Sequence, residues 1–232
     1  MPTSRHSQVL AKLCPHRGIG VENSLAAIQS GITANPLFVE FDIQWHNNDL
    51  YLGHPPEVGK NTLHEALELF RNTSTLPKID IKLTSQTSNS ALKALIVQLS
   101  TWNPKKALIN IAGDLTADKY FQAEIRLMAS TDKNILLNID LERYSGKSKS
   151  AITAHIKHLQ RIPFSISPNL ETNTIDAINF AKQESIHDIH FWSYFDKRYS
   201  TNDLYKRMEQ CSKNGLQVYF DIKTQNISDL QQ

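Results

Sequence analysis

The sequence predicts an α/β protein built as a (β/α)8 (TIM) barrel, and three observations support this prediction. Eight short apolar, β-branched runs alternate with amphipathic stretches of helical spacing. No low-complexity linker interrupts them, so we expect residues 1–232 to form a single barrel domain. Acidic residues recur near the ends of four of the runs. A doubly wound open sheet is the alternative, because periodicity alone cannot close a barrel.

The predicted strands are short runs of the length that a buried parallel strand needs. They are Gln8–Leu13, Leu37–Ile43, Lys78–Leu83, Ala107–Ile111, Ile135–Ile139, Phe164–Ile166, Asp188–Trp192 and Gln217–Ile222. One addition to the repeat is a hairpin, in which the chain turns at Asn47–Asp49 and returns through Leu50–Leu52.

The predicted helices lie between these strands and carry apolar residues three and four positions apart, as Leu92, Leu95, Ile96 and Leu99 do. They are Ser24–Ala34, Thr62–Arg71, Asn89–Leu99, Ala117–Met128, Ser150–Leu159, Thr172–Gln183 and Asn202–Lys213.

Composition describes an ordinary soluble globular protein, with 40% hydrophobic and 21% charged residues. A net charge of +2 is too small for a nucleic-acid partner. Cys14 and Cys211 are far apart and in no metal or redox spacing, which favours a reducing compartment. The first residues lack a secretory signal, and no apolar run reaches the ~18 residues of a transmembrane segment. We therefore expect a cytoplasmic protein.

Four predicted strands carry an aspartate in a similar setting, namely Asp42, Asp80, Asp140 and Asp221. A charge near the carboxyl end of a parallel strand is costly in a core but natural at the catalytic rim of a barrel. Alternation along a strand places Glu40 on the same face as Asp42. The sequence therefore predicts carboxylates gathered at one end of the barrel.

Glu40 and Asp42 would be two close, buried like charges, which need a cation to neutralise them. Oxygen ligands of this kind suit Mg²⁺ or Ca²⁺, and Asp80 on the neighbouring strand is the natural third ligand. Lys82, beyond Asp80, can contact a phosphate oxygen. The alternative interpretation is a set of ion pairs at the rim, Glu40 with Arg17 and Asp80 with Lys82.

His16, Arg17 and Gly18 follow the first predicted strand directly. Arg17 is a bidentate phosphate donor, and His16 is one of two histidines that can exchange protons with a substrate. The second is His54, which the predicted hairpin folds back toward the acidic strand.

Further residues complete the candidate site. Glu22 is expected to belong to the site, whereas Asn23 or Ser24 is expected to cap the next helix, with Ser24 the favoured cap. Trp192, at the end of a predicted strand, lines a substrate pocket or packs in the core. Asp221 is a further pocket candidate on the last predicted strand.

Taken together, these residues resemble the glycerophosphodiester phosphodiesterases and, more distantly, the sphingomyelinase D-like toxins. The stretches that carry the resemblance are His16-Arg17-Gly18, Glu22-Asn23-Ser24, Glu40-Phe41-Asp42, Asp49, Gly53-His54, Thr62–Leu67, Asp80-Ile81-Lys82 and Ser200–Val218. The resemblance implies a (β/α)8 barrel that holds a divalent cation through Glu40, Asp42 and Asp80. It also implies His16 and His54 as general base and acid, with Arg17 and Lys82 on the phosphate.

The chain departs from the family pattern in four places. The third metal position is Asp80 rather than glutamate, and Pro55 rather than aspartate follows His54. The segment from His54 to Thr62 is too short for the small cap insertion of the phosphodiesterases. The last strand reads Val218-Tyr219-Phe220-Asp221 where the family has Trp-Thr-Val-Asn. An uncapped site is expected to be more open to its substrate.

The leading hypothesis is thus a metal-dependent phosphodiesterase that cleaves a glycerophosphodiester or lysophospholipid-like small molecule, releasing an alcohol and a glycerol phosphate. Two alternatives are a non-catalytic phosphate-binding barrel and a different metal-dependent barrel lyase. The lyase would need a Schiff-base lysine or an enolate-stabilising set, for which Lys82 is the only obvious candidate.

Overall fold

A computed structural model describes residues 4–102, 106–130, 135–140, 164–170, 172–193 and 198–223. The helices are α1 Arg5–Leu10, α2 Leu25–Thr33, α3 Leu63–Phe70, α4 Ser88–Trp102, α5 Ala117–Ser130, α7 Thr174–Gln183 and α8 Thr201–Lys213. The strands are β1 Leu13–Pro15, β2 Phe38–His46, β3 Asp49–Leu52, β4 Leu76–Thr84, β5 Ala107–Asp114, β6 Ile135–Asp140, β7 Phe164–Ser167, β8 Asp188–Trp192 and β9 Gln217–Ile222.

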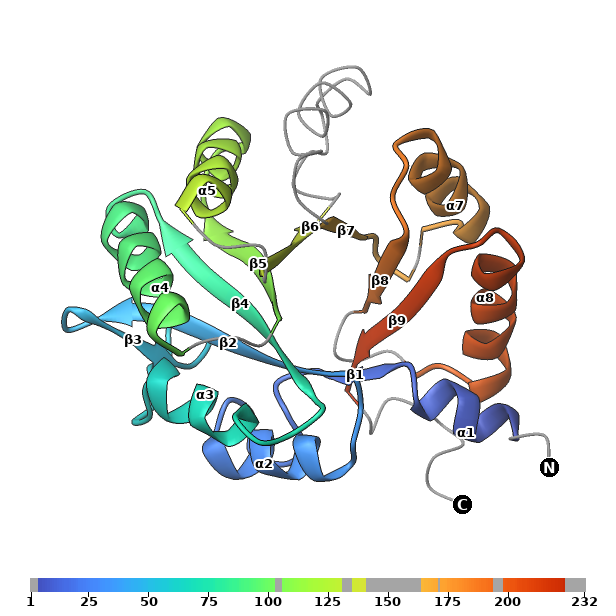
Figure 1. Ribbon diagram of the computed structural model, residues 1–232, viewed down its shortest axis with the longest axis horizontal. Coiled ribbons are helices and arrows are strands. Elements are labelled where there is room, and N and C mark those ends of the chain that lie inside the picture. Colours follow the sequence, from blue (N-terminus) through green and yellow to red (C-terminus); the bar gives the residue numbers. More distant parts are fainter. Residues whose placement is uncertain are drawn as a thin grey trace.

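The nine strands form one sheet in the order β1-β9-β8-β7-β6-β5-β4-β2-β3. Every pairing is parallel except that of β2 with β3, which form the predicted hairpin. The sheet curls until β1 lies beside β2, although the ladders of the described strands pair β1 with β9 and β2 with β3 and β4 (Figure 1). The architecture is the predicted α/β barrel, with a seam between β1 and β2.

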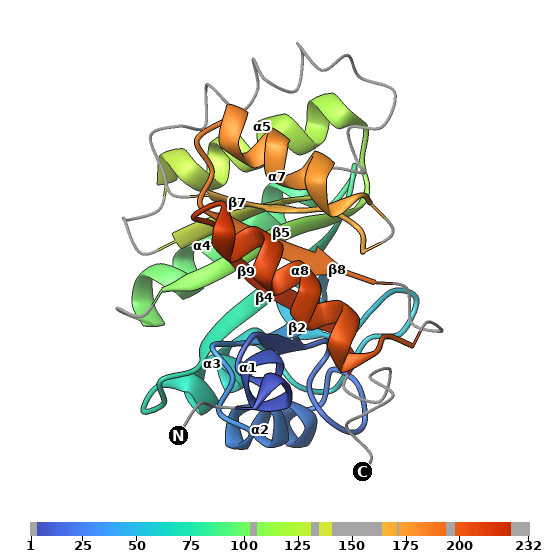
Figure 2. The ribbon, with the colours of Figure 1, turned by 90° about the vertical axis from the view of Figure 1, so that its right-hand side faces the viewer.

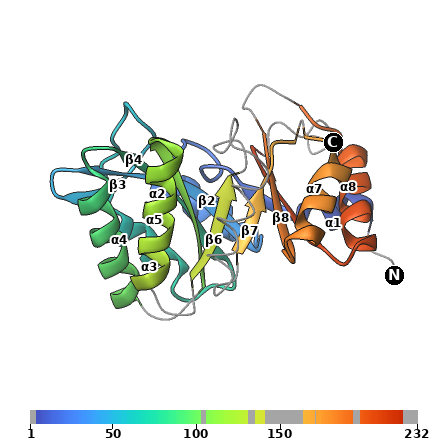
Figure 3. The ribbon, with the colours of Figure 1, turned by 90° about the horizontal axis from the view of Figure 1, so that it is seen from above.

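The helices lie outside the ring of strands and bury two apolar clusters against it. Seen from above, α2 to α5 cover one side, while α7 and α8 cover the other together with α1 (Figure 3). Figure 2 shows α8 running across the outside of β9, with α1 beside it. A third, smaller cluster lies inside the barrel and includes Phe38, Leu108 and Tyr219. None of the described helices is both long and apolar enough to span a bilayer.

Local sequence explains where the helices near the site begin. The hydroxyl of Ser24 accepts a hydrogen bond from the amide of Ala27 at 3.1 Å, so Ser24 caps α2 as expected. Thr62 and Glu65 form a reciprocal capping box at the start of α3. Asn47 and Asn48 adopt positive φ in the hairpin turn, a conformation that asparagine tolerates well.

The predicted strands from Leu37 onward match β2 and β4 to β9, and six predicted helices match α2, α3, α4, α5, α7 and α8. The predicted first strand, Gln8–Leu13, is wrong. Ser4 caps a short helix, α1, that ends at Leu10, and the strand is Leu13–Pro15. The sequence did not indicate this helix, because six residues with a single buried side chain, Val9, are too few to show a helical period. The predicted helix Ser150–Leu159 lies outside the described residues.

Candidate active site

Three carboxylates lie together inside the carboxyl end of the barrel. Glu40 and Asp42 come from β2 and Asp80 from β4, where Asp42 and Asp80 are partners in the parallel ladder. All three residues are buried, and each offers an oxygen within 4.8 Å of the others. The alternation of side chains along the two strands therefore gathers these groups on one face.

The surroundings of Glu40 disfavour its charged form. Its Oε2 accepts the backbone N–H of Arg17 at 2.6 Å, whereas Oε1 is buried and accepts no hydrogen bond among the described residues. Burial raises the pKa of Glu40 to about 8; the nearby His16 opposes this effect, and the negative charges of Asp42, Asp221 and Asp80 add to it. Three clustered oxygen donors with an orphaned lone pair fit a hard divalent cation such as Mg²⁺ or Ca²⁺.

Two side-chain cations contact the same cluster. Lys82 Nζ lies 2.8 Å from Oδ1 of Asp42 and 2.7 Å from Oδ2 of Asp80. Burial opposes the charged form of Lys82, but Asp80 and Asp42 outweigh it and raise its pKa. Arg17 Nε lies 2.6 Å from Oδ2 of Asp42. The Asp80–Lys82 pair of the alternative interpretation is thus present, while the Arg17 guanidinium contacts Asp42 and Glu22.

Residues of the Glu22-Asn23-Ser24 stretch divide into separate roles. Glu22 accepts a hydrogen bond from Arg17 Nη1 at 2.9 Å and pairs with Lys223. Its carboxylate holds the far side of the Arg17 guanidinium. Asn23 Nδ2 donates to Oδ2 of Asp42 at 3.0 Å, and the amide of Asp42 donates to Asn23 Oδ1 at 2.8 Å. Sequence reasoning considered Asn23 only as a helix cap and missed this contact.

Arg17 reaches Glu40 and Asp42 because its backbone adopts the left-handed conformation, with φ of +58°. That turn directs the Arg17 N–H onto Glu40 while the side chain returns to Asp42. Gly18 follows with φ of +79°, and a Cβ there would lie 2.6 Å from the backbone of Ala27 at the start of α2. Glycine is therefore required for the close packing of this turn on the helix.

His16, at the end of β1, is held by acidic residues on either side of the seam. Its Nδ1 lies 3.1 Å from Oδ1 of Asp221 on β9 and 3.4 Å from Oε2 of Glu40 on β2. Burial lowers the pKa of His16, but Glu40 and Asp221 outweigh that effect and raise it.

Lys78 on β4 pairs with the other oxygen of Asp221, in the interior of the barrel. Sequence reasoning missed Lys78, although alternation places it on the same face as Asp80 and Lys82.

His54 lies at the mouth of a cavity of about 340 Å³ that Arg17 also lines. The hairpin carries His54 there, since the amide of Gly53 donates to the carbonyl of Asp42 at 3.0 Å. His54 is exposed, and its Nδ1 lies 2.8 Å from the carbonyl of Pro55, to which an Nδ1–H would donate. The remaining lining residues are Glu22, Asn23, Gly53, Pro55, Pro56, Glu57, Val58 and Gly59.

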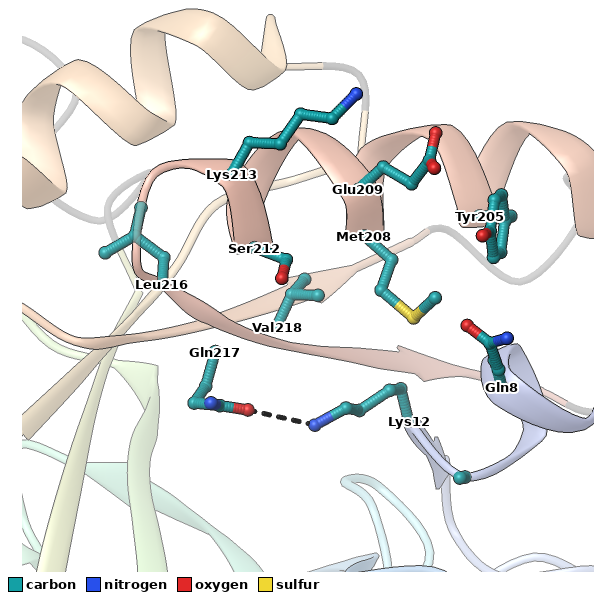
Figure 4. A pocket seen from close by; sticks show the side chains of 11 residues that line it. Gln8, Lys12, Tyr205, Met208, Glu209, Ser212, Lys213, Leu216, Gln217 and Val218 are labelled. Atoms are coloured by element: carbon teal, nitrogen blue, oxygen red, sulfur yellow. Dashed lines mark hydrogen bonds between the residues drawn. The ribbon is translucent and has the colours of Figure 1, made fainter. Parts of the chain in front are cut away.

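Trp192 and Asp221 are partners in the ladder of β8 with β9. The cavity beside His54 is lined by neither of them. A larger cavity, of about 510 Å³, lies between α1 and α8 (Figure 4). Its lining includes Lys12, which directly precedes β1, and Gln217, the first residue of β9. It lies at the amino ends of these strands, and none of the residues predicted for the site lines it.

Comparison with solved structures identifies proteins of the same fold. A phosphodiesterase from Oleispira antarctica, solved with the product sn-glycerol-3-phosphate, superposes with a TM-score of 0.65 at 13% identity, over 94% of this chain and 96% of that one. A glycerophosphodiester phosphodiesterase from Parabacteroides distasonis gives 0.62 at 13% identity, over 90% and 92% of the two chains. No protein-family model matches the sequence, and neither does any curated protein.

Proposed function

We propose that this protein is a metal-dependent phosphodiesterase acting on glycerophosphodiesters. The observation that carries the proposal is the cluster at the carboxyl end of the barrel, where Glu40, Asp42 and Asp80 converge beside Arg17 and His16. Its place in the fold supports the proposal, because barrel enzymes work at this end of their strands. The shared fold of solved phosphodiesterases supports it as well.

In this proposal, positively charged side chains bind the phosphate of the substrate. Arg17 lines the cavity and presents a guanidinium whose fork geometry matches two phosphate oxygens. Lys82 supplies a second, more compact positive charge deeper in the barrel. Glu22 holds the Arg17 side chain through its contact with Nη1, and both residues line the cavity.

The two histidines move the protons of the reaction. One takes the proton of the attacking hydroxyl, which is water or a neighbouring hydroxyl of the substrate, and the other protonates the leaving alkoxide. His16 is largely buried beside the carboxylates, and His54 is exposed at the cavity mouth. The cavity lined by His54 and Arg17 suits a small glycerol head group or a lysophospholipid whose chain extends outward.

Glu40, Asp42 and Asp80 would hold the divalent cation, Mg²⁺ or Ca²⁺, in this scheme. When bound, the cation neutralises the phosphate and stabilises the charge that develops in the transition state. Glu40 gains from its presence, because burial raises its pKa and its Oε1 accepts no hydrogen bond from the described residues.

Particular residues distinguish the proposed phosphodiesterase from two alternative functions. A Schiff-base lyase needs a lysine with a lowered pKa, whereas the pKa values of both Lys78 and Lys82 are raised by their carboxylate partners. A non-catalytic phosphate-binding barrel is favoured by one observation, the contact of Lys82 with two of the three proposed metal ligands. Turnover of a phosphodiester substrate distinguishes catalysis from binding.

The two cysteines support a cellular location as part of the same proposal. Cys14 and Cys211 are free and buried, which supports a reducing compartment such as the cytoplasm.

The test is cleavage of glycerophosphocholine, glycerophosphoethanolamine, glycerophosphoinositol and lysophosphatidylcholine in Mg²⁺, Ca²⁺ or EDTA. We expect turnover with a divalent cation, its loss in EDTA, and its loss in His16→Ala and His54→Ala. His64→Ala is the matched control, because His64 is exposed on α3. Detection of a cyclic phosphate product would identify a substrate hydroxyl as the attacking group. Phosphate binding without turnover of any substrate would favour the non-catalytic alternative.

A further inference from the structure

We propose that Asp221 and Lys78 are positioning residues that fix the orientation and the tautomer of His16. This inference rests on the proposed function, in which His16 transfers a proton. Asp221 would hold the ring proton on Nδ1, so that Nε2 is the nitrogen that faces the chemistry.

The three residues form a chain of contacts between separate strands. Asp221 Oδ1 lies 3.1 Å from His16 Nδ1, and Asp221 Oδ2 pairs with Lys78 Nζ. Each carboxylate oxygen therefore has its own donor, which sets the plane of the carboxylate and through it the plane of the imidazole. A histidine nitrogen that donates to a carboxylate keeps its proton, and the opposite nitrogen is left to accept one.

Burial makes this arrangement specific. The side chains of Lys78 and Asp221 are 1% and 6% exposed, so neither can exchange its partner for water. A buried aspartate without a cationic partner would be an uncompensated charge beside Glu40, and Lys78 prevents this. The pair also spans the seam, since Lys78 belongs to β4 and Asp221 to β9, with β2 and β1 between them.

A surface ion pair of this protein provides the contrast. Glu68 and Arg71 form a bidentate contact on α3, yet both are exposed and neither touches a residue of the candidate site. Asp221 and Lys78 differ from such a pair because both are buried and because Asp221 contacts His16.

Paired double variants separate positioning from simple charge removal. Lys78→Met/Asp221→Asn and Lys78→Met/Asp221→Ala both remove the buried ion pair, but only the first keeps an oxygen that can accept from His16. We expect Asp221→Ala to lower kcat on the order of 10- to 100-fold with little change in KM, as loss of an orienting partner commonly does. Lys78→Met/Asp221→Asn should regain most of that kcat, whereas Lys78→Met/Asp221→Ala should not. Glu68→Gln is the control and should retain wild-type kinetics.

Nitrogen-15 NMR of histidine-labelled protein reads the tautomer directly and needs no substrate. The His16 signals are identified among the nine histidines by their loss in His16→Ala. At a pH above the raised pKa of His16, where the ring is neutral, we expect the wild-type ring to be protonated at Nδ1, and Asp221→Ala to shift the population toward the Nε2–H tautomer.

The outcomes keep this inference distinct from the proposed function. Equal kcat for the two double variants, or an unchanged His16 tautomer in Asp221→Ala, would overturn positioning while phosphodiesterase activity stands. If the wild type cleaves no phosphodiester, the proposed function fails, and the NMR experiment still decides whether Asp221 sets the His16 tautomer.

Discussion

Asn23 and Asp42 hold each other through two reciprocal hydrogen bonds inside the barrel. The Asn23 amide nitrogen donates to the carboxylate at 3.0 Å, and the Asp42 backbone N–H donates to the Asn23 carbonyl oxygen at 2.8 Å. Asn23 thereby fixes both the strand and the side chain of one proposed metal ligand. Ser24, the next residue, caps α2 and ties the same turn to that helix.

Replacing Asn23 should therefore weaken both the fold and cation binding. Asn23→Ala leaves the buried Asp42 amide without its acceptor, which costs about 1–3 kcal/mol of unfolding free energy. We expect divalent-cation affinity to fall as well, because Asp42 is no longer oriented. Denaturant unfolding and calorimetric titration with Mg²⁺ and Ca²⁺ measure the two effects. Asn202→Ala, which removes an exposed side-chain contact with Arg5, should change neither.

Lys82 should compete with a divalent cation for the carboxylates that it contacts. In Lys82→Met the ammonium is gone from Asp42 and Asp80, so we expect tighter Mg²⁺ or Ca²⁺ binding and, in the same variant, slower phosphodiester cleavage. Calorimetry and the cleavage assay give the two readouts. Lys182→Met, on the exposed face of α7, serves as the control. Weaker cation binding in Lys82→Met would contradict the competition.

The raised pKa of Glu40 makes stability depend on pH in the absence of divalent cations. Folded Glu40 keeps a proton up to about pH 8, whereas the unfolded chain releases it near pH 4.5. The folded state therefore binds more protons within this window, and stability falls as pH rises through it. The raised pKa of His16 acts in the same direction above pH 6.5.

Thermal unfolding in EDTA between pH 5 and pH 8 measures this dependence. We expect the wild-type Tm to fall with pH, by ~2–4 °C for each kcal/mol lost. Glu40→Gln should show a flatter profile, because it removes the titrating group. Added Mg²⁺ or Ca²⁺ should raise Tm more at pH 8 than at pH 5. A wild-type profile parallel to that of Glu40→Gln would rule out Glu40 as the source.

Gly53 should be intolerant of a side chain because of what surrounds it. Its φ is +135°, and a Cβ there would lie 2.6 Å from the carbonyl oxygen of Glu57. Gly53→Ala must shift the segment 53–59 that lines the cavity and carries His54, so we expect a marked loss of turnover. Gly20→Ala is a matched control, since Gly20 also has positive φ, at +118°, but no atom within 4 Å of such a Cβ. Similar activity in the two variants would show that the contact is unimportant.

Periodicity made most of the barrel predictable, because alternation and helical spacing are local properties of the chain. Asp188–Trp192 and Gln217–Ile222 were predicted with the bounds that β8 and β9 have. The same alternation indicated that Glu40, Asp42 and Asp80 would converge. It could not identify α1, whose six residues are too few to show a period.

Pairings between distant residues lay beyond local reasoning. Lys78 meets Asp221 only because the sheet curls, and the two are 143 positions apart. The reciprocal bonds of Asn23 likewise depend on the left-handed turns at Arg17 and Asn23, which the sequence does not specify. Those contacts determine the charge balance of the site, so the sequence indicated which groups gather but not how they neutralise one another.

The pairing of the first strand with the last has a consequence for how the protein is made. β1 has its ladder with β9, and His16 meets Asp221 across 205 positions of sequence. Contacts of such long range form late, because the intervening chain must be ordered first. During synthesis on the ribosome, β1 remains without its partner until all the other described strands have emerged. A nascent chain that stops before β9 lacks Asp221, which contacts both Lys78 and His16. Such a chain has the early strands of the barrel but an incomplete candidate site.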